Sequence, residues 1–133
     1  MSHASPATIL LVDDDPAVRE VTAAMLEDLG YEVIEADDGA AALDLLARIG
    51  RIDLMLVDFS MPGMTGMELI KEVTEGRPEL PVLLVTGYAD DRALAAMGED
   101  RLVLKPFRTE DLARKVRVAL SGPDSGQVVS LRR

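Results

Sequence analysis

The chain contains no cysteine and no tryptophan among its 133 residues. Without cysteine it cannot form a disulfide scaffold, a thiolate zinc site or a cysteine nucleophile. Two Phe and two Tyr are too few for the aromatic platforms on which nucleic-acid bases stack. Basic residues are scarce too: 14 Lys and Arg stand against 24 Asp and Glu, giving a net charge of −10. This acidity argues against nucleic acid as a partner, because phosphates are bound by basic side chains.

Long apolar runs are also missing. No run approaches the roughly 20 residues that a membrane-spanning helix needs, and residues 1–7 lack the charged and apolar regions of a signal peptide. The length is that of one domain. We therefore expect a single cytoplasmic domain with no membrane partner.

Short apolar runs alternate with amphipathic stretches along the chain. The apolar runs predict strands at 8–12, 32–36, 52–57, 81–85 and 101–104. The amphipathic stretches predict helices at 16–29, 40–49, 65–74, 90–97 and 109–121. Strict alternation of strand and helix indicates an α/β fold, with a doubly wound parallel sheet, right-handed crossovers and helices on both faces.

Capping and turn residues predict where the helices begin and end. Asp15 is expected to cap the first helix, with Pro16 at its first position and Gly30 after its end. Thr109 is expected to cap the last helix. The apolar residues at helical spacing in the first helix, expected on its buried face, are Val18, Val21, Met25, Leu26 and Leu29.

Polar residues follow four of the predicted strands directly. Asp13 and Asp14 follow the first strand, Asp58 the third, Thr86 the fourth and Lys105 the fifth. Ligands of doubly wound sheets bind at the carboxyl ends of the strands. We therefore expect these side chains to converge at one edge of the domain.

Three carboxylates at one place repel one another, and a small hard cation removes the conflict. Oxygen ligands of this kind suit Mg²⁺ or Mn²⁺. Asp58 ends a buried strand, and a carboxylate there can act as a nucleophile that forms an aspartyl phosphate. Lys105 adds a positive charge and Thr86 a hydroxyl, which are groups that phosphoryl transfer uses.

Four segments, in this order, give the chain a recognisable pattern: ILLVDDDP (9–16), LVDFSMPGMTGMEL (56–69), LLVTGY (83–88) and LKPF (104–107). With these segments, residues 8–121 resemble the receiver domain of a two-component response regulator. The resemblance implies a flavodoxin-like sheet of five parallel strands in the order 2-1-3-4-5. It leaves residues 1–7 as an N-terminal tail and 122–133 as a disordered C-terminal tail or linker stub.

The resemblance also implies roles for individual residues. Asp58 would accept a phosphoryl group from the phosphohistidine of a histidine kinase or of a histidine phosphotransfer protein. Asp13, Asp14 and Asp58, with the backbone carbonyl of Ser60, would hold Mg²⁺. Lys105 would contact the phosphoryl group and Thr86 would be the switch hydroxyl. The positions expected to line the entrance or shape the loop are Ser60, Met61, Pro62, Gly66, Gly87 and Tyr88.

Other features of the resemblance concern the partner and the switch. Exposed positions of the first helix around Arg19, Thr22 and Ala23 would select the kinase. Leu102 occupies a position where receivers often carry Tyr or Phe, and the interval from Thr86 to Lys105 is short for the family. Any signal is then expected to pass through Thr86 and the loop after it.

Several functions compete with a receiver. A phosphatase with an Asp nucleophile, as in haloacid-dehalogenase-like proteins, needs a second Asp two residues later, where this chain has Ser60. A flavodoxin-like cofactor carrier needs a phosphate loop after the first strand, where residues 13–15 are acidic. A degenerate receiver that only binds a partner would not need the full set of site residues. Because no output domain follows residue 121, we expect a stand-alone receiver or the receiver of a hybrid histidine kinase. Neither would be an enzyme beyond its own phosphorylation and dephosphorylation.

Overall fold

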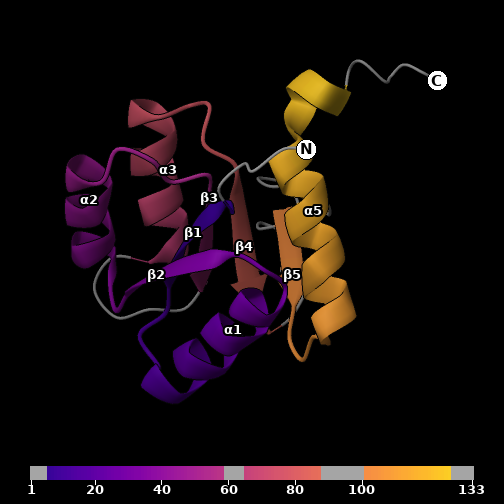
Figure 1. Cartoon of the computed structure of the whole chain (residues 1–133). Helices are drawn as coiled ribbons and strands as arrows, with labels where there is room; N and C mark the ends of the chain where they lie inside the picture. Colours follow the sequence, from indigo (N-terminus) through magenta and orange to yellow (C-terminus); the bar gives the residue numbers. More distant parts are fainter. Residues whose placement is uncertain (1–5, 59–64, 88–100, 127–133) are drawn as a thin grey trace.

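The computed structural model describes residues 6–58, 65–87 and 101–126 of the chain, with side chains as far as 121. A five-stranded parallel sheet has the order β2-β1-β3-β4-β5, which confirms the predicted topology (Figure 1). Its strands are β1 (Thr8–Val12), β2 (Glu32–Ala36), β3 (Leu54–Asp58), β4 (Val82–Thr86) and β5 (Leu102–Leu104). The described helices are α1 (Pro16–Asp28), α2 (Gly39–Arg48), α3 (Gly66–Gly76) and α5 (Thr109–Gly126). The helix predicted at 90–97 lies outside the described residues.

Helices cover both faces of the sheet, α2 and α3 on one face and α1 and α5 on the other (Figure 1). Successive strand residues point to opposite faces. In β1, for example, Leu10 and Val12 pack on the side of α2 and α3, and Ile9 and Leu11 on the side of α1 and α5. Strands buried on both faces need the continuous apolar runs that the sequence contains. No described helix has the combination of length and apolar character that would cross a membrane.

The start of α1 is fixed by its cap, as predicted. The Asp15 carboxylate accepts hydrogen bonds from the backbone N–H groups of Ala17 at 3.0 Å and Val18 at 3.3 Å. Pro16 occupies the first turn, where its missing N–H costs nothing. The helix ends before Gly30, whose φ of +99° is strained for any residue with a side chain.

The predicted buried face of α1 is partly wrong. Val21 is 57% exposed, whereas Thr22, Ala23 and Leu26 are buried against the sheet. Neighbouring helical residues are about 100° apart around the axis. The face of α1 that packs on the sheet is centred on Thr22 and Leu26. Val21 lies to one side of this face and is turned towards solvent.

Both ends of α5 differ from the prediction, and the ends of α1, α2 and α3 differ by one or two residues. Thr109 is the first residue of α5 rather than its cap, because the Arg108 carbonyl accepts the first helical bond, from Leu112 N–H at 3.1 Å. The Asp111 carboxylate reaches back to the Arg108 N–H at 3.1 Å. The helix also continues to Gly126, so residues 122–126 of the predicted tail are helical. Adding residues to an existing helix is easier than starting one, which favours this extension.

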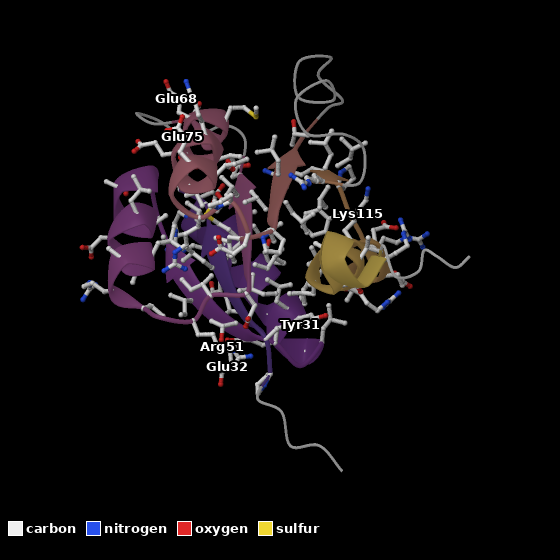
Figure 2. The ribbon with its side chains drawn as sticks, turned by 90° about the horizontal axis from the view of Figure 1, so that it is seen from above. Tyr31, Glu32, Arg51, Glu68, Glu75 and Lys115 are labelled. Carbon is white, nitrogen blue, oxygen red and sulfur yellow. The ribbon has the colours of Figure 1, made fainter. Side chains whose placement is uncertain are left out.

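The amino-terminal edge of the sheet is closed by hydrogen bonds within the chain. The Asp53 carboxylate accepts a bond from the Thr8 N–H at 2.7 Å and pairs with Arg51 at 3.2 Å. Figure 2 shows Arg51, Glu32 and Tyr31 on one side of the view and Glu68, on α3, on the opposite side. These hydrogen bonds tie down the amino ends of β1 and β3.

Candidate functional site

Residues from neighbouring strands meet at the carboxyl edge of the sheet. Asp13 follows the last residue of β1, Asp58 ends β3, Thr86 ends β4 and Lys105 follows β5. The parallel register pairs Val12 with Val57, Asp58 with Val85, and Thr86 with Leu104. Strands in register end side by side, which explains why residues so distant in the sequence lie at one edge.

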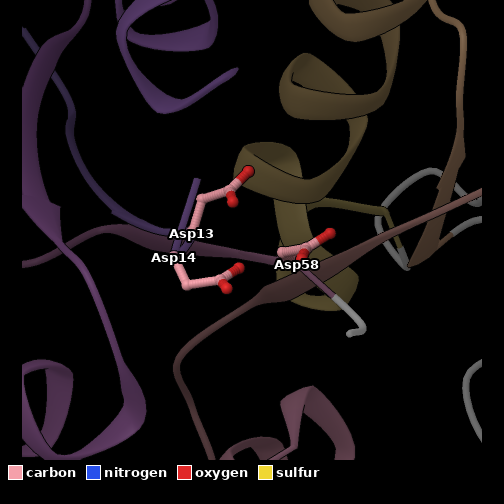
Figure 3. A group of neighbouring side chains, drawn as sticks. All are labelled: Asp13, Asp14 and Asp58. Carbon is pink, nitrogen blue, oxygen red and sulfur yellow. The ribbon is translucent and has the colours of Figure 1, made fainter. Parts of the chain in front are cut away.

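Three carboxylates form a cluster at this edge (Figure 3). One oxygen from each of Asp13, Asp14 and Asp58 lies within 4.8 Å of the others. Asp13 and Asp58 are buried, with 5% and 7% of their surfaces exposed, while Asp14 is exposed. The cluster therefore combines two carboxylates in a low-dielectric position with one that remains open to solvent.

The surroundings of Asp13 raise the pKa of its carboxyl group above the ordinary value of 3.8. Burial is the largest cause, because it disfavours the charged form. The negative charges of Asp58 and Asp14 raise the pKa further. The hydrogen bond from the Asp15 N–H and the charge of Lys105 act in the opposite direction. Burial and the two neighbouring carboxylates together outweigh the hydrogen bond and the lysine charge, and the pKa of Asp13 is raised.

Lys105 is the cation that contacts the cluster. Its Nζ lies 3.0 Å from Oδ1 of Asp58 and donates a hydrogen bond to it. The Lys105 backbone N–H donates to the Thr86 carbonyl at 2.8 Å, which anchors the end of β5 to the end of β4. The peptide bond between Lys105 and Pro106 is cis. The Lys105 charge is thus held on the side of Asp58 that faces β4 and β5.

Asp13 is held at both its backbone and its side chain. Its N–H donates to the Ala36 carbonyl at 3.1 Å, and its Oδ1 accepts from the Asp15 N–H at 2.9 Å. The Asp15 side chain itself caps α1 and stays outside the cluster, as the sequence indicated. One carboxylate oxygen of Asp13 is among the clustered ligand atoms.

The remaining predicted site residues divide into those that the structure describes and those that it does not. Thr86 is buried at the end of β4 and Gly87 is exposed next to it. Gly66 is the buried first residue of α3. Leu102 is buried in the core. The positions outside the described residues are Ser60, Met61, Pro62 and Tyr88.

The residues expected to select a kinase are placed differently from the prediction. Thr22 and Ala23 are buried, each 4% exposed, because they face the sheet. Arg19 is engaged with the backbone of Asp13 and with Glu35. The sequence pattern did not predict this contact to a site residue. Its only signal is an arginine one helical turn after the acidic segment 13–15. The exposed residues in the first three turns of α1 are Pro16, Ala17, Glu20, Val21 and Ala24.

The carboxylate cluster fits a divalent cation. Its donors are oxygens only, which is the ligand set of Mg²⁺. A bound cation would favour the charged form of Asp13, whose pKa is raised first by burial and then by the neighbouring carboxylates. Mg²⁺ uses few carboxylates and keeps several waters, so three clustered acids leave coordination positions for a substrate oxygen.

Comparison with known proteins agrees with this fold. The family model of the response regulator receiver domain matches residues 9–117, and the chain belongs to this family of two-component signalling modules. It is 40% identical over 114 residues to the chemotaxis protein CheY of Pseudomonas aeruginosa, covering 81% of this chain and 91% of CheY.

Longer relatives contain the same module. The chain is 36% identical over 122 residues to the sensor kinase CckA of Brucella abortus, covering 89% of this chain and 13% of the kinase. It is 37% identical over 126 residues to the response regulator MprA of a Mycobacterium species, covering 91% of this chain and 54% of MprA. The chain therefore spans only part of the length of these two relatives.

Solved structures show the same architecture. A response regulator receiver domain protein from Clostridium thermocellum has a TM-score of 0.81 at 29% identity, covering 86% of this chain and 94% of that one. The response regulator TrrA from Thermotoga maritima, solved in complex with Mg²⁺ and BeF, has a TM-score of 0.76 at 33% identity. That match covers 85% of this chain and 98% of TrrA.

Proposed function

We propose that this receiver domain is a phosphorylation-activated switch whose phosphoacceptor is Asp58. The observation that carries the proposal is the position of the Asp58 carboxylate. It lies within 4.8 Å of the carboxylates of Asp13 and Asp14, and 3.0 Å from the ammonium group of Lys105. A nucleophile beside a cation site and a fixed positive charge is the arrangement that phosphoryl transfer requires.

The phosphoryl donor in this proposal is a phosphohistidine of a histidine kinase or a histidine phosphotransfer protein. An oxygen of Asp58 attacks the phosphorus, and a P–O bond forms as the P–N bond of the donor breaks. The electron pair of that bond stays on the histidine nitrogen. Lys105 is placed to contact the equatorial oxygens as charge develops on them. The domain catalyses only its own phosphorylation and dephosphorylation.

The residues that would hold Mg²⁺ are Asp13, Asp14 and Asp58, with the backbone carbonyl of Ser60. When bound, the ion neutralises charge on the phosphoryl oxygens. The complex of TrrA with Mg²⁺ and BeF supports magnesium for a relative of the same fold. Nothing comparable supports Mn²⁺, so the proposal is limited to Mg²⁺.

The conformational response is proposed to begin at Thr86. Its carbonyl already accepts the Lys105 N–H, so the phosphoryl-contacting lysine and the switch threonine share one junction between β4 and β5. Leu102, buried in β5, takes the place of the aromatic side chain that many receivers use. We infer that the signal passes through Thr86 and the segment after it, without an aromatic rotation.

A receiver within a hybrid histidine kinase, acting as a phosphate sink or internal regulator, is the second candidate. The 36% identity to the CckA sensor kinase favours it. Both candidates place the domain in the cytoplasm, where kinases have access to ATP. Both also make Asp58 the acceptor, so the two differ in partner and not in chemistry.

The experiment that tests the proposal is intact-mass spectrometry after incubation with acetyl phosphate and Mg²⁺. We expect one added phosphoryl group on the wild-type protein and none on Asp58→Asn or on a sample with the metal chelated. An adduct of equal yield on Asp58→Asn would contradict the assignment.

A further inference from the structure

Arg19 joins the acidic cluster to the neighbouring strand. From the second turn of α1, its Nη1 donates a hydrogen bond to the main-chain carbonyl of Asp13 at 2.8 Å. Its Nε pairs with Oε1 of Glu35 on β2 at 3.0 Å. The Arg19 side chain is only 20% exposed. One planar guanidinium thus connects the end of β1, the start of α1 and the end of β2.

The contact with Arg19 completes the hydrogen bonding of the Asp13 main chain. Asp13 is the first residue after β1, where the β1–β3 ladder no longer holds the chain. Its N–H bonds to Ala36 and its carbonyl to Arg19, so both backbone groups are satisfied from outside its own strand. A buried carbonyl without a partner costs free energy, and the chain would shift to recover one. Because the carboxylate moves with the backbone, such a shift would disperse the acid cluster.

We propose that Arg19 is a positioning residue of the metal site, holding the backbone of Asp13 so that its carboxylate faces Asp14 and Asp58. The inference rests on the proposed Mg²⁺ site and assigns Arg19 no contact with the ion. Groups that hydrogen-bond to metal ligands commonly change metal affinity 10- to 100-fold when they are removed. For a bond to the ligand's backbone we expect the lower end of that range.

The charge of Arg19 and its hydrogen bonds predict opposite changes in Mg²⁺ affinity when the residue is replaced, which makes the inference testable. A cation near the cluster repels Mg²⁺, so removing Arg19 would tighten binding if its charge mattered most. If its hydrogen bonds matter most, the same change weakens binding. We expect the second result, because Glu35 already neutralises the guanidinium at 3.0 Å.

The matched control is Arg48 on α2. Arg48 pairs with Asp44 at 3.0 Å, four residues earlier on the same helix, with 67% of its side chain exposed. Arg19→Gln and Arg48→Gln make the same chemical change and the same change in net charge. Only the first removes a bond to the acid cluster.

Isothermal titration of Mg²⁺ into the metal-free protein is the test. We expect Kd to rise about 10-fold in Arg19→Gln and to remain at the wild-type value in Arg48→Gln. The Mg²⁺ concentration for half-maximal phosphorylation by acetyl phosphate should rise by the same factor, with an unchanged rate at saturating Mg²⁺. Binding as tight as that of Arg48→Gln, or tighter, overturns the inference.

Two further outcomes are also decisive. If Arg19→Gln does not fold, Arg19→Lys keeps the charge and loses the paired donors: a raised Kd supports positioning and a wild-type Kd overturns it. If the wild-type protein itself binds no Mg²⁺, the proposed function fails and this inference fails with it. If the wild-type protein binds Mg²⁺ and Arg19→Gln binds it equally tightly, the inference about Arg19 fails and the proposed function stands.

Discussion

Nζ of Lys105 lies 3.0 Å from Oδ1 of Asp58, and this pair joins the end of β5 to the end of β3 across β4. The Asp58 side chain is 9% exposed and that of Lys105 36%. A carboxylate this buried, beside two other acids, depends on the lysine for compensation. The same contact that stabilises the metal-free fold also places a positive charge where a phosphoryl group would lie.

Lys105→Ala is expected to destabilise the metal-free protein. Breaking a buried pair costs about 3–5 kcal/mol, but the exposure of Lys105 reduces this to an expected loss of about 1–2 kcal/mol. Urea unfolding in the presence of a chelator measures it. Lys71→Ala, at an exposed position of α3, is the control. Equal free energies of unfolding for the two variants would show that Asp58 does not depend on its lysine.

Asp13→Asn is expected to stabilise the metal-free protein at neutral pH. Folding raises the pKa of Asp13, so the folded state holds its proton more tightly than the unfolded state. Its contribution to stability is therefore present below the ordinary pKa of 3.8 and is lost as the pH rises through the raised value. Asparagine avoids this loss and keeps an oxygen for the Asp15 N–H.

The measurement is the free energy of unfolding from pH 4 to 7 with a chelator present. The difference between Asp13→Asn and wild type should grow as the pH rises. Asp28→Asn, which removes an exposed carboxylate at the end of α1, is the control. In the presence of Mg²⁺ the wild-type protein should instead be the more stable of the two, because only it has all three carboxylate ligands. A less stable Asp13→Asn at pH 7 without metal would refute the charge account.

Asp15→Ala separates the capping acid from the site acids. Loss of a helix cap costs about 0.5–2 kcal/mol, and Asp15→Asn should recover most of it because asparagine also caps. Mg²⁺ affinity should stay within about twofold of wild type, since the backbone N–H that Asp13 accepts remains. A large loss of Mg²⁺ affinity with unchanged stability would instead make Asp15 a metal ligand.

The exposed part of α1 offers a test of partner recognition. Val21→Asp is expected to slow phosphotransfer from a cognate kinase at least severalfold and to leave phosphorylation by acetyl phosphate unchanged. Val21, 57% exposed, is a large apolar side chain on α1 that a partner can contact. Val118→Asp, at a similarly exposed valine on α5, is the control. Equal kinase rates for both variants would exclude this part of α1.

Much of the fold and most of the acid cluster could be predicted from the sequence. Apolar runs on both faces identify parallel strands, and the polar residues that follow them must then share one edge. The carboxylates of Asp13, Asp14 and Asp58 are therefore expected together, and they do lie together. The capping of α1 by Asp15 was predictable because it depends on local spacing alone.

Most of the errors concern features that depend on tertiary packing. The rotation of α1 on the sheet decides that Thr22 is buried and Val21 exposed, and an apolar count cannot fix that rotation. The contact of Arg19 depends on the end of β2 lying beside the end of β1, which brings Glu35 within reach. The end of α5 at Gly126 depends on helix extension past Gly122, a residue of low helix propensity.

The most direct test of the central claim is to locate the phosphoryl group. The wild-type protein would be phosphorylated by a histidine-phosphorylated phosphotransfer protein in Mg²⁺, reduced with borohydride, which converts an aspartyl phosphate to homoserine, and digested for peptide mass spectrometry. We predict homoserine at position 58 alone, absent when the metal is chelated. Modification of Asp13 or Asp14 with an intact Asp58 would contradict the account.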